Sequence, residues 1–228
     1  MTILAVTKKL LKVCSIAVSS AIAAGALSTG EAQGLVLTFD DLDATSEFDG
    51  NQIPNGYGGL NWDNFYYLTT PTYQVNPSGY TFGTVSSPNV AYNSFGEPGT
   101  VSSVSIDGGQ FDFNSAYLTA AWSNGLDILV EGFSDGITKY ATTVTVDTTS
   151  PTQFNFDFLD IDSLKFTSSG GIDVGYGGSG TQIVLDNFTY NSKTVPEPTT
   201  ILGLLTVTSF GIALSRKQKW QQKATSKV

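Results

Sequence analysis

The sequence predicts an all-β fold, a β-sandwich of the jelly-roll type, between two terminal targeting segments. Short runs of β-branched and aromatic residues, separated by Gly, Asn, Asp, Ser and Pro, fill residues 35–192. No segment outside the termini keeps a helical hydrophobic period, and no crossover helices support a parallel sheet. We expect a signal helix before the sandwich and a transmembrane helix after it.

The N-terminus has the three parts of a secretory signal peptide. Basic residues open the chain, an apolar core spans residues 10 to about 27, and the small residues Gly30 and Ala32 precede the expected cleavage site. The alternative, a permanent membrane anchor, needs a longer apolar core than this one, which Ser and Gly interrupt. Residues 1–32 are therefore interpreted as a signal peptide for the secretion machinery.

The expected strands follow the hydrophobic pattern along the mature chain. In 110–118, 137–146 and 153–158, apolar or aromatic side chains alternate with polar ones, which indicates sheets with one buried face. Turn sequences such as IDGG and SDG separate neighbouring strands. In chain order the expected strands are 35–39, 60–68, 79–85, 101–106, 110–122, 126–133, 137–146, 153–158, 163–169 and 182–190.

The charge and residue types of the mature chain exclude several classes of function. From Glu31 to Glu197, three basic residues stand against 20 acidic ones, a net charge of −17, which repels nucleic-acid phosphates. The chain has no histidine, and its single cysteine, Cys14, lies in the signal peptide. These facts exclude Ser-His-Asp and Cys-His catalysis, histidine-ligated zinc and thiolate metal sites.

The C-terminus combines a proline-containing stretch, an apolar run and a basic end. The run TTILGLLTVTSFGIAL has 16 residues, fewer than the about 20 that a stable membrane-spanning helix needs. Basic residues from Arg216 onward would stay on the cytoplasmic side, which leaves the acidic domain outside. Pro196 and Pro198 oppose helix formation, so the stretch before the apolar run is extended and exposed.

Three features of this tail follow one another in a specific order: Val195-Pro196-Glu197-Pro198, a short apolar segment, and Arg216 in a basic end. This order resembles the PEP-CTERM sorting signal. The resemblance implies recognition and processing near the motif by exosortase, a membrane cysteine protease of bacteria that make extracellular polysaccharide. About a dozen residues follow Arg216, more than such signals usually carry, so a simple membrane anchor is the alternative.

The order of features along the mature domain gives a second resemblance. LTFDDL, IPNGYGGLNWDNFYYL, DILVEGF, IDSLKFTSSGG and a closing IVLDNFTY are similar to carbohydrate-binding-module-like jelly rolls. In those folds the first and last strands are neighbours, which would bring together Asp40, Asp41, Asp186 and Asn187. Calcium prefers several oxygen ligands, so we predict a structural calcium there. The alternative is that these side chains hydrogen-bond to turn backbones.

Aromatic residues beside glycine-rich turns are candidates for sugar contact. Tyr57 and Trp62 lie around the glycines of IPNGYGGLNW, and Trp122 ends another expected strand. Exposed rings at these positions would stack on the rings of a polysaccharide. The alternative is that the glycines serve tight turns and the tryptophans belong to the core.

The sequence therefore predicts a signal peptide (1–32), a secreted β-sandwich (33–193) and a sorting signal (194–228). We expect an exported bacterial surface or extracellular-matrix protein, held in the membrane by its C-terminal helix until exosortase processes it. Its domain is expected to bind or to be structural, with exopolysaccharide as a partner and no catalysis. The alternative is a dedicated carbohydrate-binding module. A glycosidase ranks third, because two carboxylates suffice for that chemistry but nothing singles out a pair.

Overall fold

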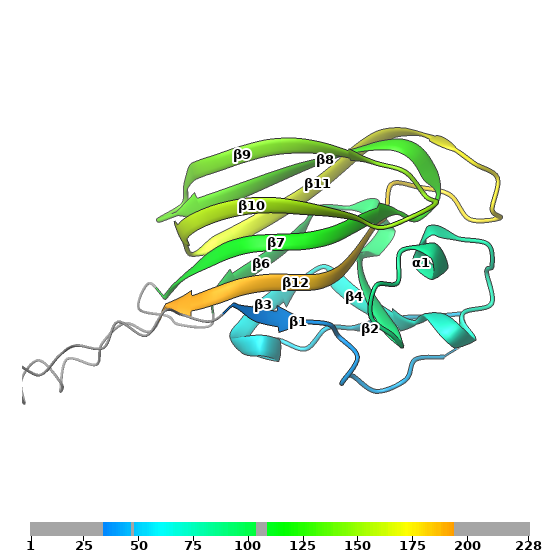
Figure 1. The fold of residues 1–228 in the computed structure, drawn as a ribbon, viewed down its shortest axis with the longest axis horizontal. Coiled ribbons are helices and arrows are strands. Elements are labelled where there is room, and N and C mark those ends of the chain that lie inside the picture. The colour runs from blue at the N-terminus through cyan, green and yellow to red at the C-terminus, as the bar shows by residue number, and fades with distance from the viewer. Residues whose placement is uncertain (1–33, 47, 104–108, 194–228) are drawn as a thin grey trace, which may run out of the picture. The chain divides into compact units, whose positions relative to one another are not determined.

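The computed structural model describes residues 34–46, 48–103 and 109–193 (Figure 1). Within these ranges, antiparallel strands form two sheets, and the longest α-helix has four residues. The all-β sandwich expected from the sequence is confirmed. The expected signal peptide and sorting segment lie outside the described residues. No helix within the described ranges is long and apolar enough to cross a membrane.

Sheet A contains seven strands and sheet B contains five. The order in sheet A is β10 (Thr152–Ile161), β7 (Gln110–Ala120), β12 (Ile183–Lys193), β5 (Asn89–Asn93), β4 (Phe65–Thr69) and β2 (Asn51–Gln52), with β1 (Leu35–Leu37) paired to β12. The order in sheet B is β3 (Leu60–Asp63), β6 (Gly99–Ser103), β11 (Ser163–Asp173), β8 (Ser123–Ser134) and β9 (Ile137–Val146). The connections contain α1 (Gly79–Phe82) and the turns η1 (Tyr57–Gly59), η2 (Thr70–Thr72) and η3 (Ser94–Gly96).

An aromatic core fills the space between the sheets. The ring of Trp62 in β3 contacts those of Phe65 and Phe188, from sheet A, at 5.6 and 5.5 Å. Phe113 of β7 stacks on Phe188 at 4.7 Å and contacts Phe166 of β11 at 6.1 Å. One face of each sheet is therefore apolar and turned inward, as the alternation in the sequence predicts.

Residues 60–68, expected as one strand, form two strands in different sheets. Asn64 has a φ of 56°, with β3 of sheet B before it and β4 of sheet A after it. Asparagine tolerates this left-handed backbone, and its side-chain amide donates to the carbonyls of Ser94, Glu97 and Pro98. One residue thus carries the chain between sheets, at the point where the buried positions change from even-numbered (Leu60, Trp62) to odd-numbered (Phe65, Tyr67).

The expected strand over 79–85 is wrong, because these residues contain α1. The Ser78 hydroxyl accepts the Thr81 N–H, and the Thr81 hydroxyl accepts the Ser78 N–H, a capping box that begins the helix. Gly79 is needed there because a Cβ would stand 1.8 Å from the carbonyl oxygen of Ala120. Close packing against β7 overrides the β propensity of the segment.

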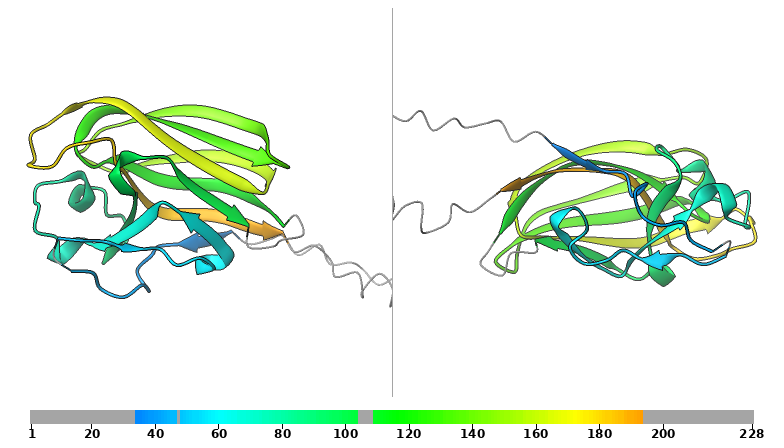
Figure 2. Two further views of the ribbon diagram at one scale, coloured as in Figure 1. Left: turned by 180° about the vertical axis from the view of Figure 1, so that it is seen from behind. Right: turned by 90° about the horizontal axis from the view of Figure 1, so that it is seen from below.

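Both chain ends of the described domain lie at one end of the sandwich. Leu35 of β1 pairs with Tyr190 near the end of β12, and β12 finishes at Lys193 (Figures 1 and 2). We call this the exit end. The opposite end carries α1 and the loop 174–182, and we call it the distal end (Figure 1).

Candidate functional site

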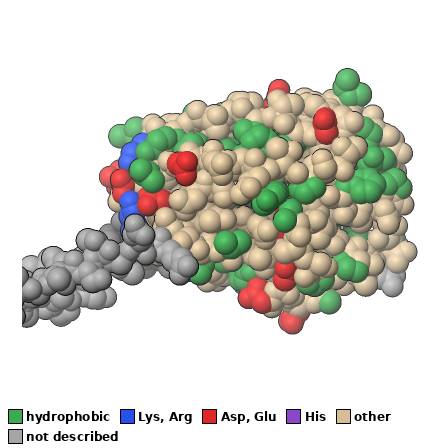
Figure 3. Space-filling model, viewed as in Figure 1, with side chains coloured by type: hydrophobic (Ala, Val, Ile, Leu, Met, Phe, Trp, Pro, Cys, Tyr) green, Lys and Arg blue, Asp and Glu red, His purple; other side chains and the backbone are tan. Residues whose placement is uncertain are grey.

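Two of the three lysines among the described residues gather at the exit end. Lys193 closes β12 and Lys139 lies near the start of β9, whereas Lys165 lies in β11, the middle strand of sheet B. In the space-filling view, blue side chains at this end stand beside red carboxylates (Figure 3). In a domain with so few cations, this grouping makes the exit end the candidate site.

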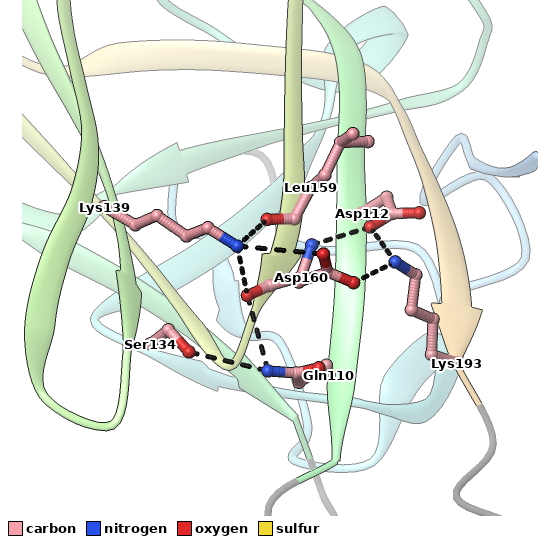
Figure 4. Close-up of polar contacts among 7 residues, drawn as sticks. All are labelled: Gln110, Asp112, Ser134, Lys139, Leu159, Asp160 and Lys193. Atoms are coloured by element: carbon pink, nitrogen blue, oxygen red, sulfur yellow. Dashed lines mark hydrogen bonds and ion pairs between the residues drawn. The ribbon is translucent and has the colours of Figure 1, made fainter.

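Lys193 joins the end of β12 to two other strands of sheet A. Its ammonium nitrogen lies 2.7 Å from Asp112 Oδ1 of β7 and also bonds to the carboxylate of Asp160 in β10 (Figure 4). Asp112 Oδ1 accepts the backbone N–H of Asp160 at 2.8 Å. We call Lys193, Asp112 and Asp160 the exit clamp. It ties three strands together at the last residue before the C-terminal segment.

A bulge in β10 positions Asp160 for the clamp. The register between β10 and β7 shifts between Phe158 and Ile161, and Asp160 has a φ of 53°. A bulge bends its strand and redirects side chains, and Asp accepts a positive φ more readily than a β-branched residue. Lys139 adds a link from sheet B, because its ammonium donates to the Leu159 carbonyl at 3.0 Å and lies 3.7 Å from Asp160 Oδ2.

Lys193 and Asp160 favour each other's charged form. The hydrogen bond and the positive charge of Lys193 lower the pKa of Asp160 below its ordinary 3.8. Hydrogen bonds to Asp112 and Asp160 raise the pKa of Lys193 above its ordinary 10.5. Each shift favours the ionised form, so the cluster is suited to holding the chain and not to exchanging protons.

The four side chains predicted to bind calcium form two pairs with separate tasks. β1 and β12 are neighbours, as the resemblance implied. The Asp186 carboxylate accepts the N–H groups of Val85 and Ser86 at 2.7 and 3.0 Å. The Ser86 hydroxyl lies 3.0 Å from Asp186 Oδ1 and 3.1 Å from Asn187 Oδ1. This pair therefore fastens the loop that precedes β5.

Asp40 and Asp41 hold other parts of the chain. Asp40 Oδ1 accepts the N–H of Asn89 at 2.9 Å, and Asp41 Oδ1 accepts the Tyr57 hydroxyl at 2.7 Å. Throughout the part of the chain that the structure describes, no three acidic side chains are grouped so that they could hold a metal ion. A structural calcium stays a prediction, which thermal unfolding with and without EDTA would test.

Two of the three aromatic residues predicted to contact sugar are core residues. Trp62 is 1% exposed and Trp122 is 5% exposed, so neither presents a ring face to a ligand, and the expectation is corrected for both. Tyr57 is half-buried and stacks on Phe39 at 5.7 Å. Burial, followed by the hydrogen bond to Asp41, raises the pKa of the Tyr57 hydroxyl above its ordinary 10.0.

The scarcity of lysine is the one sequence signal that points to the exit clamp. Its three members come from distant strands, and only the strand order brings them together. The bulge that redirects Asp160 has a local marker in QFNFDFLDI, because the alternation changes phase at the adjacent apolar residues Phe158 and Leu159, but this marker does not indicate which side chains Asp160 meets. The clamp therefore follows from the fold and not from a motif.

The segment after the exit clamp matches a known sorting signal. Residues 194–217 match the family described as the PEP-CTERM protein-sorting motif. The chain carries a PEP-CTERM motif. The match begins directly after Lys193 and includes the Pro-Glu-Pro triplet and Arg216. No curated protein matches the chain.

Several solved structures resemble the chain in fold. TmCBM61 in complex with β-1,4-galactotriose has 12% identity and a TM-score of 0.34, with 63% of this chain and 99% of that chain covered. An adhesin domain of Lys-gingipain from Porphyromonas gingivalis has 12% identity and a TM-score of 0.41, covering 71% and 99%. The family 11 carbohydrate-binding module of a Clostridium thermocellum cellulosomal cellulase has 11% identity and a TM-score of 0.32, covering 72% and 98%. At these values the likeness concerns fold and not function.

Proposed function

We propose that the chain is an exported surface or extracellular-matrix protein that an exosortase sorts through its PEP-CTERM motif and processes near that motif. The observation that carries this proposal is the boundary between fold and motif. The matched segment starts at residue 194, and the exit clamp fixes the residue before it. A protease can therefore bind and cut the tail while the folded domain keeps every strand.

We infer that the domain binds or is structural and does not catalyse. A glycosidase needs an accessible carboxylic acid that retains its proton near neutral pH. Burial raises the pKa of Asp186 to about 6, but this residue is 1% exposed and its carboxylate accepts the N–H groups of Val85 and Ser86, so it does not meet a ligand. In the pair Asp112 and Asp160, the Lys193 ammonium bonds to both carboxylates and lowers the pKa of Asp160, the opposite of what a proton donor requires. This acidic pair is therefore suited to a structural task.

Substitutions in the motif test the sorting proposal. In the native host, Glu197→Ala with Pro198→Ala should stop release and leave the protein in membranes. The matched control, Thr199→Ala with Thr200→Ala, changes two neighbouring residues outside the triplet and should leave release unchanged. Equal release of both variants into the medium, measured by immunoblot of cell fractions, would contradict exosortase sorting.

A dedicated carbohydrate-binding module is the second candidate function, and Phe95 in η3 favours it. Its side chain is 88% exposed and its φ is 55°, a strained conformation for an aromatic residue. Amide groups of Asn64 and Asn93 bond to carbonyls of the same turn, the latter at 2.8 Å from the Glu97 carbonyl oxygen. The backbone of the turn is thus fixed while the ring stands in solvent, so stacking on a ligand would carry little cost for ordering the backbone.

The net negative charge selects the class of polysaccharide in this second candidate. An acidic domain repels anionic polymers, so the ligand would be a neutral polysaccharide. Phe95→Ala should abolish retention on an insoluble neutral glucan. Ile137→Ala, which removes a 73% exposed side chain at the exit end, is the matched control and should be retained like the wild type. Equal retention of both variants would exclude Phe95 as the contact.

A further inference from the structure

β9 forms an open edge of sheet B. It pairs with β8 along one side, and no strand within the described ranges pairs with its other side. Figure 1 shows β9 at the margin of the sandwich. An edge strand presents unpaired N–H and C=O groups, so proteins usually shield such edges with charges, prolines or bulges.

The two ten-residue edge strands of the sandwich differ in this protection. β10, the edge of sheet A, has two register shifts and positive φ values at Asp157 and Asp160, which interrupt a straight edge. β9 has one register shift, at Lys139, and is in continuous register with β8 from Tyr140 to Val146. The sequence there, YATTVTV, has no charge, proline or glycine and is rich in β-branched residues. This stretch lacks the usual protection.

The charges that flank this stretch are complementary under antiparallel self-pairing. From Ala141 to Thr145 the odd-numbered residues of β9 face outward, and directly opposed residues in a sheet share a face. A twofold axis through Thr143 therefore pairs Ala141 with Thr145. It also brings Asp147 of each copy near the end of β9 that carries Lys139 of the other copy, the bulged residue whose ammonium bonds to Leu159 and Asp160 in its own sandwich. In an acidic domain, this edge lets two copies approach with opposite charges facing each other.

We propose that two copies of the chain pair through antiparallel β9 strands centred on Thr143, which joins two five-stranded sheets into one. Core side chains at this flank, including Tyr140, Phe154 and Phe156, are only half-buried in the single chain. A second sandwich beside them removes more of their surface from water. The pairing is independent of the sorting motif.

Cysteine crosslinking tests the register. The mature chain has no cysteine, because Cys14 lies in the expected signal peptide. Thr143→Cys in the exported protein should form a covalent dimer with oxidised glutathione, since the twofold axis sets the two thiols opposite each other. Thr149→Cys, exposed beyond the strand, is the matched control and should stay monomeric. Absence of a Thr143→Cys dimer, or equal crosslinking of both variants, would overturn the proposal.

Sedimentation velocity tests the pairing without a crosslink. The exported protein should associate with increasing concentration. Thr143→Glu, which places two carboxylates opposite each other, should weaken the dimer about fivefold to tenfold while thermal unfolding shows an intact fold. A wild-type protein that stays monomeric, or a dimer that Thr143→Glu leaves unchanged, would overturn the proposal.

Discussion

The exit end and the distal end of the sandwich are held by different forces. At the exit end, the ammonium group of Lys193 bonds to two carboxylates. At the distal end, the Tyr80 ring contacts those of Tyr73, Tyr92 and Trp122 at 5.3 to 5.4 Å, in a cluster separate from the main core. Charge stabilises one end and aromatic packing the other. The two ends should therefore respond differently to truncation, pH and salt.

Acid affects the two ends in opposite directions. Burial raises the pKa of Asp186 from 3.8 to about 6, although hydrogen bonds from Val85, Ser86 and Asn187 act the other way. The protonated Asp186 carboxyl is the form that the folded state favours. The stability that it contributes is therefore fully present below pH 3.8 and is lost as the pH rises through about 6. The lowered pKa of Asp160 gives the exit clamp the reverse behaviour, because that contribution is lost as the pH falls below 3.8.

Truncation of the aromatic cluster should have the largest effect. Trp122→Ala leaves a cavity beside Tyr80 and should lower the free energy of unfolding by about 3–5 kcal/mol. Phe82→Ala, which removes a 41% exposed ring of the same end, is the control and should cost less than about 1 kcal/mol. Urea unfolding of the exported protein measures both. Equal losses would show that the cluster does not hold the distal end.

Removal of the titrating group at the distal end should change the pH dependence of stability. In Asp186→Asn, position 186 no longer binds a proton on acidification. Between pH 7 and pH 4 the wild type should gain about 2 kcal/mol of unfolding free energy relative to this variant. Thr149→Ala, which changes an exposed residue without a titrating group, should follow the wild type. Parallel curves for wild type and Asp186→Asn would contradict the raised pKa.

Loss of the exit clamp should lower the free energy of unfolding by a smaller amount, and this loss should have the opposite pH dependence to that of Asp186→Asn. Lys193→Met leaves Asp112 without its cation and should cost about 1–2 kcal/mol at pH 7, because the pair is partly exposed. Below the pKa of Asp160 the difference from wild type should shrink. Lys165→Met, which removes a lysine outside the clamp, should cost less than about 0.5 kcal/mol. The same cost for both variants would contradict the clamp.

Salt should change the stability cost of a substitution at the exit end but not at the distal end, and this is the smallest of the expected differences. At about 1 M salt the screening length falls to about 3 Å, so the cost of Lys193→Met should shrink by a few tenths of a kcal/mol. The cost of Trp122→Ala should not shrink, because apolar packing is not screened. Measuring both variants at low and high salt separates the two forces. An equal decrease in both costs would contradict the claim that charge stabilises the exit end and aromatic packing the distal end.

The long strands and the tail could be predicted because each has a regular local pattern. Alternation predicted β9 over its full length, 137–146, and the order of Pro-Glu-Pro, apolar run and basic end predicted the match at 194–217. Periodicity reports which face of a strand is buried, and it does so for each segment alone. Local patterns therefore indicated the fold class and the sorting motif.

Features that depend on single backbone conformations or on strand order could not be predicted. The positive φ of Asn64 moves the chain between sheets, and the bulge at Asp160 creates the clamp. The hydrophobic alternation changes phase at both places, but a phase change does not indicate which strand or side chain comes next. Asn89 and Asn93, typical turn residues, are buried at the ends of β5, which was not among the expected strands. Such polar residues enter a core when their amides find backbone partners elsewhere.

The central claim is that the folded domain ends at the exit clamp and that the sorting tail is removed beyond it. The intact mass of the protein from its own host, compared between membrane and extracellular fractions, tests this directly. The account predicts an extracellular protein whose mass ends near Pro196 to Pro198, with Lys193 retained. A full-length C-terminus found only in membranes would contradict sorting. A mass that ends before Lys193 would contradict the clamp as the boundary of the domain.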